Sequence, residues 1–373
     1  AFYDLPRKFN IAFDGGGLIG SVEDTNDIGL KAVRVMHESG EIKPGVYFRV
    51  KLGGATGHKT FARDLGVLVR PHEVLKVVDA LVRVYIANGN RGDRKRARLK
   101  HLLETWPLDR YLAETEKLLG YQLLRAPLDS DGKAPLEAEP QTPDVPHSHV
   151  GVFPQKQPGL SYVGAALPVG QITSKQLLRL ADLVDNYGSG EIRLTVWQNL
   201  VLPNIPNAYV ETVKKALVKM GLDWRQSNLR SGVIACTGNS YCKFASSNTK
   251  GHALALAEYL EKRLQLDQPI NIHVTGCPNS CAQHYMGDIG LLATKVKVSG
   301  ETVEGYHVFV GGGFGKNQAV GRQVFTGISF EEIKPTLERM LRSYLTNRQA
   351  AESFQAFTRR HDLNALQTLF TNG

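Results

Sequence analysis

Apolar residues recur every three or four positions in four stretches of the chain. This spacing is typical of a helix that packs one face against a core. The third stretch also ends at Gly221, and glycine commonly terminates helices. The pattern predicts helices over 74–89, 174–188, 207–221 and 331–347.

Runs rich in apolar and β-branched residues lie between the helical stretches and predict strands. Around the second and third helices, the order strand, helix, two strands, helix indicates an α+β half-domain with an antiparallel sheet. The strand-forming runs occupy 9–16, 48–57, 161–172, 191–205, 270–277 and 306–315.

Two pairs of these runs resemble each other, which predicts an internal duplication. FNIAFDGG at 9–16 resembles INIHVTGC at 270–277, and FRVKLGGATG at 48–57 resembles YHVFVGGGFG at 306–315. In both copies a predicted helix follows the second run. Self-similarity at matching separations indicates repeated units. Chance similarity between strands that end in glycine stays open as the alternative.

The alignment of the two copies places Gly16 at Cys277 and Gly20 at Cys281. Only the second copy therefore carries thiols at these positions. Between the copies, residues 126–160 hold seven of the seventeen prolines. Proline opposes helices and central strands, so this segment is predicted to be an extended linker.

Composition restricts the class of protein. With 373 residues, 42% hydrophobic and 22% charged, the chain is typical of a globular protein of two or three domains. No apolar run reaches the ~18 residues of a membrane span, so we expect no membrane association. The net charge of +9 indicates an anionic partner: nucleic acid, an acidic protein or a polyanionic cofactor.

The four cysteines are the strongest chemical signal. Their spacing is C-x5-C-x34-C-x3-C, and no fifth cysteine exists. Clustered pairs in a long chain are unlike a disulfide framework and like a metal or iron–sulfur site. Zinc knuckles favour gaps of two to four residues, which the x5 gap does not match. The pattern favours a cubane cluster, with zinc or unligated thiols as alternatives.

Two further motifs could indicate a binding site, but each is better explained by a structural role. Gly15, Gly17 and Gly20 form GxGxxG, but the acidic SVEDTND that follows would repel phosphate. We interpret this loop as a connection between strands.

The basic run 91–100 lacks interleaved aromatic residues, and its apolar positions fit an amphipathic helix. It favours a solvated or acid-binding face over a nucleic-acid face.

At the cysteines the sequence resembles the siroheme and [4Fe–4S] nitrite and sulfite reductases. ACTGNSYCKFASSNTK at 235–250 and VTGCPNSC at 274–281 are similar to the family's cluster motifs. Three more segments resemble the family: LPRKFN at 5–10, RKRARLKHL at 94–102 and IRLTVWQNLVLPNI at 192–205. The resemblance extends across essentially the whole chain.

The resemblance implies a duplicated α+β fold, with a ferredoxin-like half-domain and two larger α/β modules around siroheme. The implied parts are a first siroheme-binding module at 1–125, incomplete at its N-terminus, a linker at 126–160, the half-domain at 161–222 and the [4Fe–4S]/siroheme module at 223–373. Family members usually carry another half-domain before LPRKF, with two arginines for the substrate face. We expect a separate chain or a longer form of this protein to supply them.

Site residues follow from the same resemblance, position by position. Cys281 matches the thiolate that bridges the cluster to siroheme iron. Arg7 and Lys8 match basic residues that face the siroheme carboxylates and the bound anion, and Asn279 matches a position near siroheme. The implied cluster ligands are Cys236, Cys242, Cys277 and Cys281.

Asn10 bears on the choice of substrate. At this position the family's sulfite reductases tend to have lysine and its nitrite reductases asparagine. A neutral amide weakens binding of a dianion such as sulfite and still hydrogen-bonds the smaller nitrite monoanion. The resemblance therefore implies nitrite as the substrate, with Asn10 and Lys8 at the reacting anion.

The implied reaction is the six-electron reduction of nitrite to ammonium. A sulfite reductase on the same scaffold and a non-catalytic iron–sulfur electron-transfer subunit are the alternatives. The positive charge fits both siroheme, which carries eight carboxylates, and an acidic electron donor such as ferredoxin. Ligand thiols must stay reduced, so we expect the protein in a bacterial cytoplasm or a plastid stroma. From the basic run we expect no nucleic-acid partner.

Overall fold

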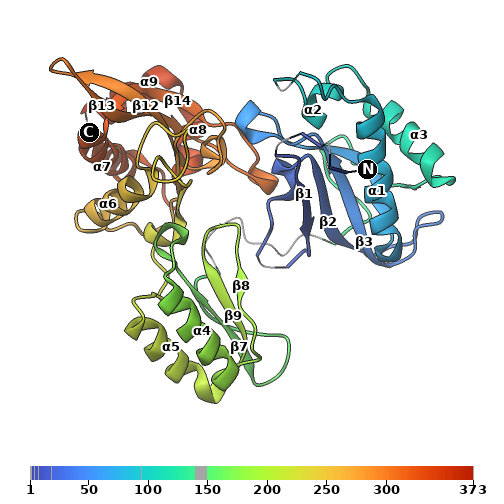
Figure 1. The fold of residues 1–373 in the computed structure, drawn as a ribbon, viewed down its shortest axis with the longest axis horizontal. Coiled ribbons are helices and arrows are strands. Elements are labelled where there is room, and N and C mark those ends of the chain that lie inside the picture. The colour runs from blue at the N-terminus through green and yellow to red at the C-terminus, as the bar shows by residue number, and fades with distance from the viewer. Residues whose placement is uncertain are drawn as a thin grey trace. The chain divides into compact units, whose positions relative to one another are not determined.

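The computed structural model describes the chain except residues 1, 4, 7, 18, 94, 139–148 and 373. The chain divides into two compact units, Ala1–Thr142 and Pro143–Gly373, and each is described by itself (Figure 1). In the described part of the chain, no helix combines the length and the apolar character needed to span a bilayer.

The first unit is a five-stranded sheet covered by helices (Figure 1). Buried apolar side chains from the sheet and all three helices form one core. On the longest helix, Val77, Leu81 and Val84 recur at helical spacing and are buried, as the sequence predicts. The strands, in sheet order, are β1 Ile11–Asp14, β2 Ile28–Val35, β3 Gly45–Leu52, β4 Arg63–Val69 and β5 Leu124–Arg125, and the helices are α1 Val74–Asn88, α2 Leu99–Leu102 and α3 Leu108–Leu119.

The second unit contains a sheet of the same size with its own core. The predicted helix over 331–347 is present and begins at Phe330, because the hydroxyl of Ser329 caps its first turn. The strands, in sheet order, are β10 Val233–Ala235, β11 Ile272–Thr275, β12 Ile289–Val298, β13 Glu301–Val310 and β14 Arg322–Ser329, and the helices are α6 Thr249–Glu261, α7 Phe330–Asn347, α8 Phe354–Arg360 and α9 Leu363–Asn372.

A four-stranded antiparallel sheet in the second unit forms the half-domain that the sequence predicts. Two amphipathic helices pack against it through a separate core. The run 191–205 contains two strands, because Gln198 adopts a left-handed φ of 59° and turns the chain. The elements are β6 Gly151–Pro154, β7 Leu160–Ala165, α4 Ser174–Tyr187, β8 Arg193–Leu194, β9 Leu200–Pro206 and α5 Val210–Lys219.

The proline-rich segment 126–160 is tied down on both sides of its undescribed part. The side chain of Glu137 forms an ion pair with Arg49, and the backbone N–H of Ala138 donates to the carbonyl of Arg34. On the other side, β6 pairs with β7. Glu137, Ala138 and β6 all lie inside the range predicted to be a linker, and each is paired with a residue outside it.

The internal duplication is confirmed by strand register. In the first unit β1 runs parallel to β2 and pairs Ile11 with Ile28, while in the second β11 runs parallel to β12 and pairs Ile272 with Ile289. The offset is 17 residues in both copies. The next two strands are antiparallel in each sheet. The GxGxxG loop is the β1–β2 connection, in agreement with its interpretation as a strand-connecting loop.

The β1–β2 and β11–β12 connections return to the sheet through the same tight turn. A short 3₁₀ helix, Glu23–Thr25 in one copy and His284–Met286 in the other, lies against a glycine of the following strand. A Cβ atom on Gly29 would lie 2.5 Å from the Glu23 carbonyl oxygen, and one on Gly290 would lie 2.0 Å from that of His284. Only glycine leaves room for the turn.

We expect Gly29→Ala and Gly290→Ala each to lower the free energy of unfolding by about 1–3 kcal/mol or more, because the new methyl group overlaps backbone. Gly45→Ala is the matched control, since its Cβ would have no neighbour nearer than 3.8 Å. Chemical denaturation measures all three. Equal stability of Gly45→Ala and Gly290→Ala would contradict the duplicated turn.

Candidate functional site

Parallel pairing brings the cysteine loops to one edge of the second sheet. Strands β10 and β11 are parallel neighbours, so their carboxyl ends lie at the same edge. Cys236 directly follows β10, and its N–H donates to the carbonyl of Val274 at 3.0 Å. Cys277 follows β11 by two residues. Two of the predicted ligands therefore leave the sheet side by side.

The loop that carries Cys242 folds back onto the loop that carries Cys277. The N–H of Ser246 donates to the carbonyl of Gly276 at 2.8 Å. A Cβ on Gly276 would lie 2.6 Å from the Ala245 Cβ and 3.4 Å from the Cys236 sulfur. Gly276 is thus required for the close approach of the two loops.

Hydrogen-bond donors face two of the sulfur atoms. The N–H of Gly276 donates to the sulfur of Cys236 at 3.2 Å, and the side-chain amide of Asn279 donates to that of Cys277 at 3.4 Å. Such bonds stabilise thiolates and tune the reduction potential of an iron–sulfur centre. They are an environment suited to thiolate ligands.

Among the described residues, no three His, Cys, Asp or Glu side chains lie close enough together to form a group for one metal ion. In addition, the Oγ1 atom of Thr275, buried at the start of the Cys277 loop, has no hydrogen-bond partner. This loop lacks an internal polar anchor at that point.

The first copy shows what an internal anchor looks like. There Asp14 occupies the position of Thr275, and its carboxylate accepts from the N–H groups of Gly16 and Ser21, both at 2.8 Å. The carboxylate closes the loop without any metal.

In the second copy the loop is held by other contacts, Ser280 Oγ with His284 Nδ1 at 2.9 Å and His273 Nδ1 with the carbonyl of Ala282 at 2.8 Å. What suits this loop to a thiolate-bound group is the pair of hydrogen bonds to the sulfurs of Cys236 and Cys277.

A turn of the half-domain supports the strand that ends at Cys236. Gln198, between β8 and β9, pairs with both backbone groups of Ala235, at 2.9 Å and 3.1 Å. The ammonium of Lys250 donates to the same carbonyl at 3.2 Å. The segment 192–205, which the sequence links to the family, therefore supports the strand that leads to Cys236, a predicted ligand.

Glu304 on β13 clamps both ends of the Cys242 loop. Its carboxylate accepts from the side chain of Asn239 and from the backbone N–H of Asn248, both at 2.8 Å. His252 approaches the same carboxylate at 3.6 Å. Sequence reasoning missed Glu304, because its partners lie more than fifty residues away along the chain.

Exposure distinguishes the cysteines from one another. Cys277 is buried, Cys236 and Cys242 are half-buried, and Cys281 is exposed. Asn279 is exposed as well. The bridging role of Cys281 and the siroheme contact of Asn279 stay predictions.

In the first unit, the LPRKFN segment alternates between the core and the surface. Leu5 and Phe9 pack against the core of the unit, and the Phe9 ring lies 5.1 Å from that of Tyr85. Lys8 and Asn10 flank Phe9 and have exposed side chains. Anchoring of Phe9 fixes the backbone from which both polar groups project. Arg7, the remaining residue predicted at siroheme, lies outside the described residues.

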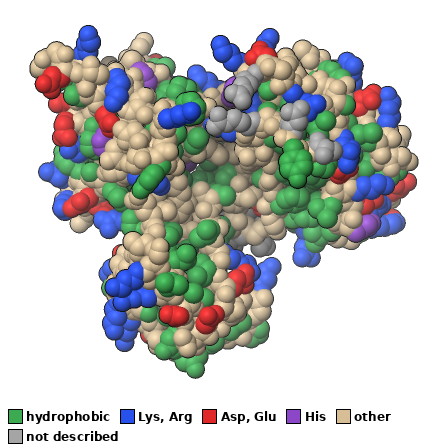
Figure 2. Space-filling model, in the orientation of Figure 1, with side chains coloured by type: hydrophobic (Ala, Val, Ile, Leu, Met, Phe, Trp, Pro, Cys, Tyr) green, Lys and Arg blue, Asp and Glu red, His purple; other side chains and the backbone are tan. Residues whose placement is uncertain are grey.

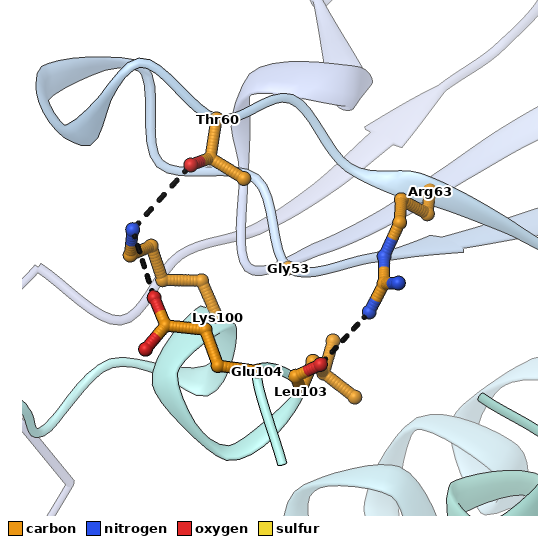
Figure 3. Close-up of a pocket in the computed structure, with 6 residues that line it drawn as sticks. All are labelled: Gly53, Thr60, Arg63, Lys100, Leu103 and Glu104. Carbon is orange, nitrogen blue, oxygen red and sulfur yellow. Dashed lines mark hydrogen bonds and ion pairs between the residues drawn. The ribbon is translucent and has the colours of Figure 1, made fainter. Parts of the chain in front are cut away.

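A cavity of about 320 Å³ lies in the first unit, lined by the β3–β4 connection and by α2. Lys100 projects into it, 3.5 Å from the hydroxyl of Thr60 and 3.3 Å from the carboxylate of Glu104 (Figure 3). Arg63 lies opposite and donates to the carbonyl of Leu103 at 3.1 Å (Figure 3). The lining offers two cationic groups and one acid.

The surroundings of His58 show that this region is electropositive. Burial lowers the pKa of His58 below its ordinary value, and the cations Lys100, Arg98 and Lys8 lower it further. The ring of His58 lies 5.4 Å from that of His101. Lys100 of the cavity and Lys8 thus both act on this imidazole, and positive charge of this kind attracts an anion.

At the end of the basic run 91–100, the acid-binding alternative holds and the solvated one does not. Arg98 pairs with Asp27 and Lys100 with Glu104, and the two cationic side chains are only 14% and 15% exposed. The helix in this region, α2, is confined to Leu99–Leu102. Periodicity could not show that Arg98 pairs with a carboxylate 71 positions earlier.

The candidate residues therefore form two sets. The second unit gathers the loops of the four cysteines, and the first gathers Lys8, Asn10, Arg63 and Lys100. Lysine and arginine side chains are spread over both units and alternate with acidic ones on the face drawn in Figure 2. Charge alone therefore does not single out another site on that face.

Comparisons with known proteins agree with this division. The nitrite/sulfite reductase ferredoxin-like half domain matches residues 153–220. The nitrite and sulphite reductase 4Fe-4S domain matches residues 1–123 and 226–367. The two stretches of the 4Fe-4S domain fall on the two copies of the duplicated sheet.

The chain is similar both to proteins named as nitrite reductases and to proteins named as sulfite reductases. A ferredoxin–nitrite reductase of Synechococcus elongatus is 36% identical over 91% of the chain and 64% of its own length. A ferredoxin sulfite reductase of Mycolicibacterium paratuberculosis is 35% identical over 98% of the chain and 64% of its own length. The solved structure of the NirA protein of Mycobacterium tuberculosis matches with a TM-score of 0.83 and 30% identity, over 93% of the chain and 62% of that structure. The chain spans just under two thirds of these proteins.

We expect Glu304→Ala to weaken iron retention by about tenfold or more. The substitution removes two hydrogen bonds to a charged group, each contributing about 1.5–3 kcal/mol, and 1.4 kcal/mol is tenfold. The rate of iron loss to a chelator measures the effect. Glu301→Ala is the control, because Glu301 is exposed on the same strand. Identical rates for the two variants would disprove the clamp.

The imidazole of His273 predicts a loss of stability in acid. Burial lowers the pKa of His273 to about 4, from 6.5. Between these values the unfolded chain takes up a proton that the folded chain does not, so the free energy of unfolding falls as the pH drops from about 6.5 to about 4. Denaturation at pH 7 and pH 5 should show a larger drop for the native protein than for His273→Asn. Equal drops would contradict the prediction.

Proposed function

The chain belongs to the family of nitrite and sulfite reductases, whose members contain siroheme and a [4Fe–4S] cluster, and from this membership we propose that it serves the six-electron reduction of nitrite to ammonium. The observation that carries the proposal is that a neutral amide, Asn10, and the ammonium of Lys8 are both exposed on either side of the anchored Phe9, and that Lys8 and the cavity residue Lys100 both act on His58. This combination suits a small monoanion that must receive protons.

Cofactor binding is divided between the two sets of residues. We propose that Cys236, Cys242, Cys277 and Cys281 would hold the cluster and that Cys281 would also hold siroheme. When bound, these groups would store and deliver the electrons that arrive one at a time. The protein's part is to hold the thiolates rigidly, through the Gly276 contact and the Glu304 clamp, so that little reorganisation accompanies each electron.

Siroheme's carboxylates need cationic partners when the macrocycle is buried. Arg63 and Lys100 line the cavity and carry the required charge, and Lys8 adds to the same positive field. We propose these three residues, with Arg7 and Asn279 from the sequence analysis, as siroheme-binding groups. Lys100 would exchange its Glu104 contact for a carboxylate of the ligand.

At the substrate, Lys8 and Asn10 have different tasks. The Lys8 ammonium stabilises the bound anion and supplies protons as N–O bonds break. The Asn10 amide donates a hydrogen bond to the oxyanion and adds no charge. An acidic ferredoxin is the proposed electron donor, attracted by the net charge of +9. We also propose the domain division at 1–125, 126–160, 161–222 and 223–373.

Sulfite reduction is the second candidate function. The relative named as a sulfite reductase covers 98% of the chain, against 91% for the relative named as a nitrite reductase. Identity near 35% does not separate the two, so Asn10 is the residue on which the choice depends.

Turnover of nitrite and of sulfite, measured side by side with a reduced artificial donor, tests the proposal. We expect nitrite to be preferred, and Asn10→Lys to shift the ratio of kcat/KM values toward sulfite by about tenfold or more, because a second ammonium favours the dianion. Siroheme and iron are counted on the same preparations.

Three outcomes would speak against the proposal. A native preference for sulfite would favour the second candidate. An unchanged ratio in Asn10→Lys would remove Asn10 from substrate selection. A protein that binds the cluster without siroheme, and turns over neither anion, would favour a non-catalytic electron-transfer subunit.

A further inference from the structure

The two copies of the duplicated sheet contain the same asparagine–aspartate pair. Asn271 and Asp288 precede β11 and β12, and Asn10 and Asp27 precede β1 and β2. In both copies the backbone N–H of the asparagine donates to the aspartate Oδ2 atom at 2.9 Å. The backbone part of the pair is therefore identical.

The side chains of the two asparagines differ. The Asn271 amide donates to Asp288 Oδ2 at 2.6 Å, and its Oδ1 atom accepts from the Asp288 N–H at 2.9 Å. The residue is buried. Among the described contacts of Asp27, by contrast, none involves the Asn10 side chain, which is exposed.

Arg98 accounts for the difference. Its guanidinium donates to both oxygens of the fully buried Asp27 carboxylate, Nε to Oδ1 at 2.9 Å and Nη2 to Oδ2 at 2.6 Å. In this bidentate arrangement the fork occupies the lone pairs that the asparagine amide uses in the second copy. Arg359, whose charge opposes the rise that burial causes in the pKa of Asp288, instead donates to the carbonyls of Gly311 and Asn317.

We propose that Arg98 is a positioning residue that keeps the Asn10 amide off Asp27 and leaves it directed toward the substrate. Without Arg98, the amide would fold back onto Asp27 as Asn271 does onto Asp288. The inference rests on the proposed function, because it takes Asn10 as a group that contacts the substrate anion.

Arg98 also links the segment that carries Asn10 to helix α2, which carries the cavity residue Lys100. Arg98 immediately precedes α2, and its N–H donates to His101 Nδ1 at 3.1 Å. Lys100, which projects into the cavity, follows two residues later (Figure 3). The Asp27–Arg98 pair thus fixes α2 and the start of β1 in one arrangement.

The test compares Arg98→Met with Asn10→Ala and with the double variant, in the protein with its cofactors. We expect each single variant to raise the KM for nitrite by about tenfold, and the double variant to raise it no further, because both changes remove the same amide from the substrate. A crystal structure of Arg98→Met should show the Asn10 amide nitrogen within hydrogen-bond distance of the Asp27 carboxylate. Arg96→Met is the control for lost charge, since Arg96 is exposed in the same basic run.

The outcomes separate this inference from the proposed function. An unchanged KM in Arg98→Met, with a raised KM in Asn10→Ala, overturns the inference and leaves the function intact. Additive effects overturn it as well, since Arg98 would then act independently of Asn10. An unchanged KM in both variants refutes the role of Asn10 itself.

Loss of Arg98 leaves a buried carboxylate without its cation, which can prevent folding. If Arg98→Met does not fold, Asp27→Asn/Arg98→Met removes both charges and keeps an acceptor for the Asn10 amide. The same rise in KM is expected there. A native KM in that variant overturns the inference.

Discussion

The parallel crossover closed by an asparagine–aspartate pair is the constraint on which both candidate sites depend. Parallel neighbours need a long connection, and here that connection contains only a loop and a 3₁₀ turn. The aspartate carboxylate ties the start of one strand to the start of the next, and a glycine lets the turn press onto the sheet. Cys277 and Cys281 lie on one such connection, and Asn10 precedes β1, the strand from which the other connection leaves.

The two copies share one sheet architecture, and different residues at matching positions give them different chemistry. In the first copy Asp14 closes the crossover loop from inside, so the positions of the thiols can be glycines. In the second copy Thr275 leaves that place without a partner, and the thiols suit an external ligand. The asparagine of the pair also differs between the copies. In the second copy the Asn271 side chain is bound by Asp288 and buried, whereas in the first copy Arg98 binds Asp27 and the Asn10 side chain is exposed.

Sequence reasoning was most successful where local pattern decides structure. The four predicted helices and the strand, helix, strand, strand, helix order of the half-domain are confirmed, since the apolar spacing that predicts them is also what packs each core. For the basic run it left a solvated and an acid-binding face open, and the last two cations bind acids, Arg98 to Asp27 and Lys100 to Glu104. Only the fold revealed that the carboxylate within reach of Arg98 is buried.

The sequence by itself determined the chemistry available to this protein: four thiols at a cluster spacing, a doubled frame, and a lysine and an asparagine in the LPRKFN segment. These depend on residue identity and on short separations along the chain. Tertiary structure alone decided which groups support that chemistry. Glu304 clamps a loop more than fifty residues away, Gln198 supports a strand in another sheet, and Arg98 releases Asn10 by binding Asp27. Hydrogen bonds of this kind depend on positions in space, which folding sets through the packing of distant segments.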